Sequence, residues 1–174
     1  MIYFSYKELI IRNMKYEDAY AITDAEIKQG WHASAEKYLK RLDDQSSGKS
    51  IALVADYSGE PVGYINLYPD SVWGALGKKG YPEIMDFGVL EKNRNQGIGT
   101  ALMNAAEELA ADYADIVYLG VGLHSGYGAA QRLYVKRGYI PDGSGVWYQN
   151  QVCKPYETCK NDDDLILYLY KKLR

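Results

Sequence analysis

The chain has few of the residues that build metal sites and disulfide frameworks. Its 174 residues include only two cysteines, two histidines, two phenylalanines and five prolines. Two thiols, Cys153 and Cys159, in an otherwise ordinary chain indicate a reduced, cytoplasmic protein rather than a disulfide scaffold. No grouping of His, Cys and Asp has the spacing of metal ligands, so we expect no metal.

Long apolar runs and an excess of basic charge are also missing. No uncharged stretch approaches the roughly 18 residues of a spanning helix, and the first residues do not have the pattern of a signal peptide. The formal net charge is -3, and the basic residues are scattered, which argues against a nucleic-acid surface. We therefore expect neither membrane nor nucleic acid as a partner. Tyrosine is abundant instead, with 18 copies, and amphipathic packing accounts for most of them.

Length and composition favour one globular domain spanning residues 1–174. Apolar periodicity and turn residues predict strands at 9–12, 51–55, 62–67, 83–90, 116–119, 145–148 and 165–170, and helices at 16–24, 33–42, 97–113 and 127–136. A short turn at 57–60 makes the second and third strands a hairpin. The segment from 83 to 119 reads as a βαβ unit with parallel outer strands. The expected class is α/β (α+β), with a mixed, mostly antiparallel central sheet, one parallel βαβ pair and helices on both faces.

The most informative segment is the turn Arg94-Asn95-Gln96-Gly97-Ile98-Gly99-Thr100. An apolar strand leads into it, and an alanine-rich helix follows at once. Such a turn directs several backbone N–H groups and the positive end of a helix dipole at one point. It is therefore suited to bind a phosphate or pyrophosphate.

Two other glycine motifs fit poorly. A dinucleotide fingerprint needs a third glycine where this chain has Leu102, and no N-terminal βαβ unit surrounds it. Gly48-Lys49-Ser50 resembles the end of a P-loop, but Asp43 stands at the first glycine position and a strand follows where a helix is required. A tight strand-to-helix connection without a ligand remains the simpler alternative.

Two segments resemble the motifs of the GNAT superfamily of N-acetyltransferases. Residues 89–102, which contain Arg94-x-x-Gly97-x-Gly99, resemble the acetyl-CoA-binding motif R/Q-x-x-G-x-G/A. Residues 130–139, Ala-Gln-Arg-Leu-Tyr-Val-Lys-Arg-Gly-Tyr, are similar to the second motif A-x-x-L-Y-x-x-x-G-F/Y. The matching motifs lie within residues 83–140, in the family's order and on the expected elements. The resemblance implies a GNAT-like sheet and acetyl-CoA as cofactor, with CoA as product.

The resemblance also implies which residues hold the cofactor. The CoA pyrophosphate would rest on the backbone N–H groups of residues 96–100, with Arg94 and Asn95 shaping the turn, and glycine would let the main chain come close. The pantetheine arm would pair like an added strand with residues near Phe87, Gly88 and Val89. The N–H of Val89 is the candidate to polarise the thioester carbonyl. The predicted cofactor-binding residues are Phe87, Gly88, Val89, Arg94, Asn95, Gln96, Gly97, Ile98, Gly99, Thr100 and Ser125.

Tyr134 matches the tyrosine of the second motif, which implies a general acid that protonates the departing CoA thiolate. A phenol with a pKa near ~10 is protonated at neutral pH and can donate to a thiolate whose conjugate acid lies near ~8.5. The alternative is a tyrosine on the buried face of an amphipathic helix.

The general base must accept a proton from a cationic amine before the amine attacks. Glu83 lies at a strand position that supplies this base in some members of the family. Asp86 on the same strand and a chain of waters are the alternatives. Period-two alternation places Glu83 and Asp86 on opposite faces unless a bulge intervenes. For Glu83 the simpler reading is a solvated carboxylate at a strand end.

One departure from the second motif is Tyr127, which stands where the family often has an asparagine that contacts the CoA arm. Ser125 could cap the following helix and bond the cofactor instead. His124 and His32 are interpreted as structural.

The acceptor is expected to be a small-molecule or peptide amine, attacked directly in a ternary complex. In relatives its groove involves regions that here contain Trp31, Tyr81 with residues 69–80, and Trp147 with the 150–163 loop, so aromatic rings could form an amine cage. The acidic residues 162–164 are either attractive to a cation or simply solvated. A non-catalytic acyl-CoA-binding or regulatory module is the alternative function, and an exposed edge at the C-terminal strands is compatible with a homodimer.

Overall fold

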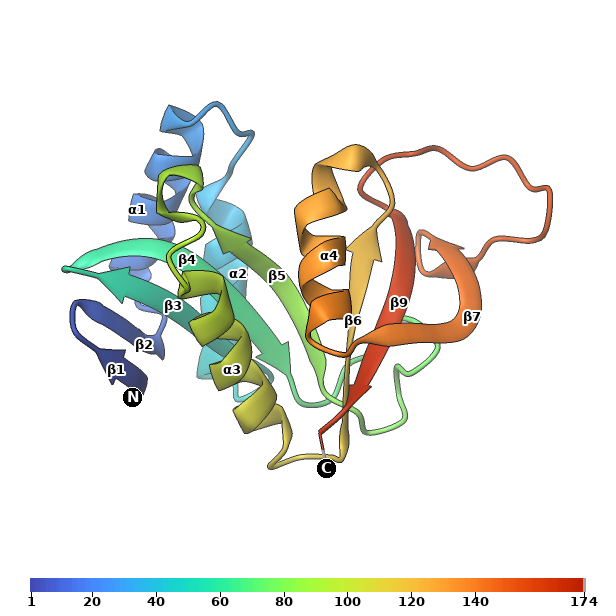
Figure 1. Cartoon of the computed structure of the whole chain (residues 1–174), viewed down its shortest axis with the longest axis horizontal. Helices are drawn as coiled ribbons and strands as arrows, with labels where there is room; N and C mark the ends of the chain where they lie inside the picture. The colour runs from blue at the N-terminus through green and yellow to red at the C-terminus, as the bar shows by residue number, and fades with distance from the viewer. Residues whose placement is uncertain (174) are drawn as a thin grey trace. The chain divides into compact units, whose positions relative to one another are not determined.

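The computed structural model describes residues 1–173, which form two compact units. The N-terminal unit contains residues 1–68 and 84–109. The C-terminal unit contains residues 69–83 and the chain from residue 110 onward. Figure 1 shows the order of the elements along the chain in both units.

Five strands follow one another in the sheet order of the N-terminal unit, β1-β2-β3-β4-β5. They are β1 (Ile2–Tyr6), β2 (Leu9–Asn13), β3 (Ile51–Tyr57), β4 (Glu60–Tyr68) and β5 (Glu83–Val89). The pairs β1–β2, β2–β3 and β3–β4 are antiparallel. The predicted hairpin between β3 and β4 is confirmed, and its turn residues Ser58 and Gly59 both have positive φ, as a tight two-residue hairpin turn requires.

Strand β1 was not predicted, because its sequence Ile-Tyr-Phe-Ser-Tyr contains no buried face. Four of its five residues are exposed, so the alternation that marks a half-buried strand is missing. Pairing with β2 through a turn at Lys7, which has a φ of 52°, places it in the sheet.

Helices cover both faces of the sheet in the N-terminal unit (Figure 1). α1 (Tyr16–Lys28) and α2 (Ala35–Ser46) lie on one face, and α3 (Ile98–Ala110) lies on the other. Residues 52–55 of β3 are consequently buried in succession instead of alternating. Ala52 and Val54 pack with Ile22 of α1 and Tyr38 of α2 in one hydrophobic cluster. All three helices were expected, with α1 and α2 each extending four residues further at the C-terminal end.

In the C-terminal unit the sheet order is β6-β9-β7-β8. The strands are β6 (Ile116–Gly122), β7 (Ile140–Tyr148), β8 (Gln151–Val152) and β9 (Leu165–Lys172), and α4 (Gly128–Lys136) follows β6. β9 pairs antiparallel with β6 and with β7. β7 begins five residues before the predicted strand. This additional first half contains Pro141 and Gly143, and its register shifts between Pro141 and Val146. Such residues disfavour a regular strand, so the pattern concealed this half.

The predicted fold class, α/β (α+β) with a mostly antiparallel sheet and helices on both faces, is confirmed. Gly138 follows α4 with a φ of 89°, as expected for a residue that ends a helix in the left-handed conformation. Among residues 1–173, no helix is long and apolar enough to cross a bilayer.

A cation with two carboxylate partners joins β2, α1 and β3. The Arg12 guanidinium donates to Asp18 at 2.7 and 3.0 Å and to Asp56 at 2.9 and 3.0 Å, and all three side chains are at most 15% exposed. The hydrogen bonds to Asp18 and then Asp56 raise the pKa of Arg12. Asp18 also accepts from the N–H of Lys15, which caps α1.

We expect Arg12→Met to lower the free energy of unfolding by about 3 kcal/mol, because it leaves two largely buried carboxylates without their cation. Urea denaturation measures the change, and Arg132→Met, at an exposed position of α4, is the matched control. A loss no larger than that of the control would contradict a structural role for Arg12.

Candidate active site

The glycine turn lies at the N-terminus of α3, where the sequence predicts an anion site. A short 3-10 helix, η1 (Glu91–Asn93), leads into it from β5. Asn95 and Gly97 adopt positive φ values of 61° and 82°, and the N–H of Ala101 donates to the carbonyl of Gly97 at 2.9 Å. The N–H groups of the first turn of a helix have no acceptor within the helix. The turn therefore presents backbone donors and the positive end of the dipole together.

The two glycines of the turn are required for different reasons. Gly97 has open space around its Cα, and its positive φ is what disfavours other residues. Gly99 packs against the ring of Phe87, where an added Cβ would lie 3.1 Å from Cζ. Thus the first turn of α3 lies directly on β5, and Gly99 serves the packing of the protein itself as well as any ligand.

Arg94 contacts residues that precede η1 in the chain. Its Nε donates to the carbonyl of Val89 at 3.2 Å, and its guanidinium lies over the ring of Trp31, 5.3 Å from the centroid. Trp31 in turn donates from Nε1 to Glu91 at 3.1 Å. Sequence reasoning assigned Trp31 to the acceptor groove; the structure places its side chain against the residues of the turn.

The strand that precedes the turn contains an irregularity. Asp86 has a φ of 48°, a strained value for a residue other than glycine. Its carboxylate accepts from Nε of Arg41 at 2.6 Å. Gly88, two residues later, faces Tyr64, whose hydroxyl oxygen would lie 2.7 Å from an added Cβ. The glycine is therefore explained by close packing of β5 against a side chain of β4.

Glu83 is buried, at 2% exposure, so the reading of a solvated carboxylate at a strand end is wrong. The hydroxyl of Ser71 donates a short hydrogen bond to its Oε2, and Ser71 also accepts from the N–H of Trp73 at 3.3 Å. Tyr118 donates to the carbonyl of Trp73 at 2.9 Å. Burial, and then the charge of Glu83, raises the pKa of Tyr118. Glu83 is thus a buried carboxylate that accepts a hydrogen bond from a hydroxyl, and an ionised carboxylate can accept a proton.

Tyr134 lies on the buried face of α4, at 6% exposure. Its ring is tilted against that of Tyr139, with the centroids 5.8 Å apart. Burial raises the pKa of Tyr134 above that of a free phenol. The side chain therefore stays protonated throughout the neutral range and can donate a proton.

The segment before α4 corrects one expectation. Ser125 does not cap α4, whose N-cap residue is Tyr127 and has no side-chain cap bond. Ser125 instead begins the 3-10 helix η2 (Ser125–Tyr127), which His124 caps by accepting from the N–H of Gly126 at 3.1 Å. The other ring nitrogen of His124 and the hydroxyl of Tyr127 both lie 2.9 Å from Oδ1 of Asp163. These bonds support the structural interpretation of His124. Asp163, one of the acidic residues at 162–164, therefore has hydrogen-bond partners within the protein.

Another aromatic residue assigned to the acceptor groove, Trp147, lies edge-on to Tyr168 with centroids 5.5 Å apart and donates from Nε1 to Ser144 at 2.7 Å. In the loop that follows, the thiols of Cys153 and Cys159 are free and 3.0 Å apart. That hydrogen bond raises the pKa of Cys153 to about 11. Cys153 is therefore not an activated nucleophile.

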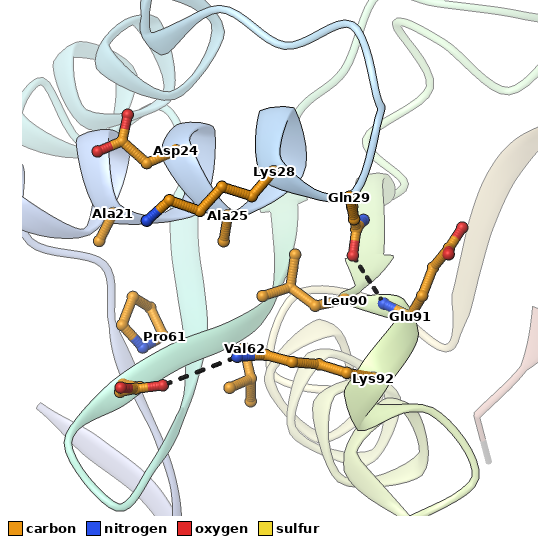
Figure 2. Close-up of a pocket in the computed structure, with 11 residues that line it drawn as sticks. Ala21, Asp24, Ala25, Lys28, Gln29, Pro61, Val62, Leu90, Glu91 and Lys92 are labelled. Atoms are coloured by element: carbon orange, nitrogen blue, oxygen red, sulfur yellow. Dashed lines mark hydrogen bonds and ion pairs between the residues drawn. The ribbon is translucent and has the colours of Figure 1, made fainter.

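The N-terminal unit contains a cavity of about 660 Å³ that sequence reasoning missed (Figure 2). Gln29 accepts from the N–H of Glu91 at 3.0 Å, and Lys92 lies 4.0 Å from Glu60. The residues that line this cavity come from α1, the start of β4 and the segment before the glycine turn: Ala21, Asp24, Ala25, Lys28, Gln29, Glu60, Pro61, Val62, Leu90, Glu91 and Lys92. Both signs of charge are present, so the lining favours neither anions nor cations.

A buried polar cluster was also missed. Glu26 of α1, Tyr38 of α2 and Tyr64 of β4 are joined by hydrogen bonds although they are far apart in the sequence. The abundance of tyrosine was the only sequence signal for it. Among residues 1–173, no group of three or more His, Cys, Asp and Glu side chains could hold a metal ion.

Comparison with known proteins identifies the family and the fold of the chain. A family model described as the acetyltransferase (GNAT) family matches residues 16–139. No curated protein matches the chain. Among solved structures, a Salmonella typhimurium acetyltransferase that modifies the N-terminal serine of ribosomal protein L7/L12 aligns with a TM-score of 0.71, at 12% identity and over 99% of both chains.

Two further structures cover nearly the whole chain. Ard1 from Thermoplasma volcanium aligns with a TM-score of 0.68, at 20% identity, over 95% of this chain and 98% of its own. A Salmonella typhimurium protein, yncA, assigned as an acetyltransferase and solved with its cofactor acetyl-CoA, aligns with a TM-score of 0.67, at 16% identity, over 97% and 95%. At these identities the likeness concerns the fold.

We expect Gly88→Ala to destabilise the protein by about 2 kcal/mol, because the new methyl group would overlap the Tyr64 ring and the core must shift. Chemical denaturation measures the loss. Gly128→Ala is the control, since its Cβ would meet only Arg132, at 3.6 Å. Equal stability of the two variants would show that β5 does not pack on Tyr64 as described.

Proposed function

The chain belongs to the GNAT acetyltransferase family, and we propose that residues 1–174 act as one N-acetyltransferase domain that transfers an acetyl group from acetyl-CoA to a primary amine. The amine nitrogen bonds to the thioester carbonyl carbon, the carbon–sulfur bond breaks, and CoA leaves as the thiol. The observation that carries the proposal is the turn of residues 94–100, which directs backbone donors from the N-terminus of α3 directly after β5.

Acetyl-CoA supplies the acetyl group as a thioester. The N–H groups of residues 96–100 would bind its pyrophosphate, because backbone donors and the helix dipole act on the same anion. Arg94 holds the shape of the turn through its bond to Val89. Phe87, Gly88 and Val89 would pair with the pantetheine arm, and the N–H of Val89 would stabilise the oxyanion. Ser125 would add a polar contact. A similar structure solved with acetyl-CoA supports this assignment.

Glu83 and Tyr134 would move the protons of the reaction. Glu83 would accept the proton that the ammonium form of the substrate must lose. Asp86 is less suitable, because an oxygen of its carboxylate is bound to the permanent cation of Arg41 at 2.6 Å. Tyr134 would donate a proton to the departing thiolate, and its raised pKa keeps that proton available.

The acceptor is a small-molecule or peptide amine, and the chemistry proposed needs no metal. The free thiols of Cys153 and Cys159 are consistent with a cytoplasmic location. One protein of similar structure modifies the N-terminal serine of a ribosomal protein. A peptide amine is therefore among the candidate acceptors.

The decisive experiment measures binding and turnover separately. Calorimetry with CoA and acetyl-CoA tests the turn, and release of free thiol with a panel of small amines and peptides tests transfer. We expect binding together with amine-dependent thiol release. Binding without turnover on any amine would favour a non-catalytic acyl-CoA-binding module, which the tyrosine at 127 also suggests. Absence of CoA binding would refute both functions.

We expect Tyr134→Phe to lower kcat about 100-fold with little change in KM for acetyl-CoA, because it removes a proton donor and keeps the ring. Burial raises the pKa of Tyr134, so the phenol stays protonated beyond the ordinary tyrosine pKa of about 10. Its donor role should therefore be constant across pH 7–9. Tyr113→Phe, at an exposed position, is the control. Unchanged turnover by Tyr134→Phe would exclude the general-acid role.

For Glu83→Gln we expect a loss of about 100-fold in kcat/KM at neutral pH. The loss should shrink as the pH approaches about 10.4, where an alkyl amine is increasingly deprotonated without help. A pH profile of Glu83→Gln beside Asp86→Asn distinguishes the two carboxylates. A loss that is independent of pH would indicate a structural role for Glu83 only.

A further inference from the structure

A buried carboxylate at the centre of the N-terminal unit is bound by two phenols. Glu26 of α1 is 3% exposed. The hydroxyl of Tyr38 donates to its Oε2 and that of Tyr64 to its Oε1, each at 2.7 Å. Burial raises the pKa of both tyrosines, so both phenols keep their protons. The carboxylate therefore accepts a hydrogen bond from a phenol on each oxygen.

A primary ammonium group lies on the outer side of the two phenols. Nζ of Lys37 is 4.7 Å from the ring centroid of Tyr38 and 4.8 Å from that of Tyr64. It also donates to the Tyr64 hydroxyl at 3.4 Å. The two rings are nearly perpendicular, with centroids 5.0 Å apart, so they form a corner that faces the ammonium. Two aromatic faces and a phenol oxygen are the features that bind an organic cation.

Lys37 itself is a weakly held occupant of this corner. The residue is exposed on α2, and a lysine stem has four rotatable bonds. The long, single hydrogen bond of 3.4 Å adds little to the contact with the rings. Rotation of the side chain into water would uncover the corner without breaking the packing beneath it.

The same tyrosine connects this corner to the strand that precedes the glycine turn. The hydroxyl oxygen of Tyr64 would lie 2.7 Å from a Cβ on Gly88. Gly88 belongs to the segment for which we propose contact with the pantetheine arm. An ammonium at Tyr64 is therefore next to the segment that would hold the thioester.

We propose that Glu26, Tyr38 and Tyr64 form the acceptor subsite for a primary alkylammonium, and that Lys37 fills it until an acceptor displaces the lysine. The assignment rests on the proposed acetyltransferase function. It identifies the acceptor class as a protonated amine on an unbranched alkyl stem, as in a lysine side chain or a free alkyl amine.

The charges around the subsite support this class. Glu26 is negative, and Asp86 acts electrostatically on Tyr64 from β5. Arg41 compensates Asp86 through their 2.6 Å contact, so Glu26 supplies the attraction that remains. An amine that bears a carboxylate on the same carbon would bring a second negative charge close to Glu26 and should bind poorly.

The test measures amine binding without acetyl-CoA, so that it stands apart from catalysis. NMR titration with n-butylammonium should give about ten-fold tighter binding to Lys37→Ala than to the parent, because the tethered competitor is removed. Lys40→Ala, an exposed lysine of the same helix, should bind like the parent. Butan-1-ol, which has the stem without the charge, should not bind either variant.

Two further experiments identify the residues that bind the amine and the kind of molecule that supplies it. In the Lys37→Ala background, Glu26→Gln should weaken n-butylammonium binding about ten-fold; Tyr64→Phe, which keeps the ring and is less disruptive, should weaken it as well. Circular dichroism confirms that each variant is folded. A lysine with both backbone ends blocked, compared with n-butylammonium, distinguishes a peptide side chain from a free amine as the better ligand.

Equal affinity of the parent and Lys37→Ala for n-butylammonium, or equal binding of butan-1-ol, would overturn the subsite. Loss of acetyl-CoA binding in the separate calorimetric experiment would refute the proposed function instead. The two failures are therefore distinguishable.

Discussion

The close approach of α3 to β5 is the constraint on which the candidate site depends. The first turn of α3 lies close on the ring of Phe87 because residue 99 has no side chain; a methyl group there would be 3.1 Å from the ring, and the ring or the helix would have to shift. A larger residue would move the helix N-terminus away from the end of β5. The backbone donors at 96–100 and the strand at 87–89 would then no longer be adjacent, and one ligand could not use both.

The opposite side of the same strand is set by a second close contact. Gly88 lets β5 pack on Tyr64 of β4, and Tyr64 extends the contact to Glu26 of α1. Helices on both faces of the sheet therefore meet at one short segment of β5. On one face lies the glycine turn with its backbone donors, and on the other lies buried Glu26 with two phenols, whose rings face the ammonium of Lys37. The thioester donor and the cationic acceptor that we propose would use these different electrostatic environments close to one strand.

Much of this arrangement follows from local patterns. The hairpin at Ser58-Gly59, the helix after the glycine turn, and the amphipathic helix that contains Tyr134 are recognisable because turn chemistry and periodicity act over a few residues. Strand β1 and the first half of β7 were not, because one has no buried face and the other contains proline and glycine. The burial of Glu83 was missed for a related reason, since Ser71 reaches it from a loop twelve residues earlier.

The sequence by itself determined the family and the turn, because these depend on consecutive residues whose backbone and spacing carry the chemistry. Only the tertiary structure decided which side chains surround that turn. Trp31 packs on Arg94, His124 caps the 3-10 helix that precedes α4, and Glu26, Tyr38, Tyr64 and Lys37 meet from three different elements. Contacts between distant residues depend on how helices pack across a sheet, and no local pattern of residues encodes that packing.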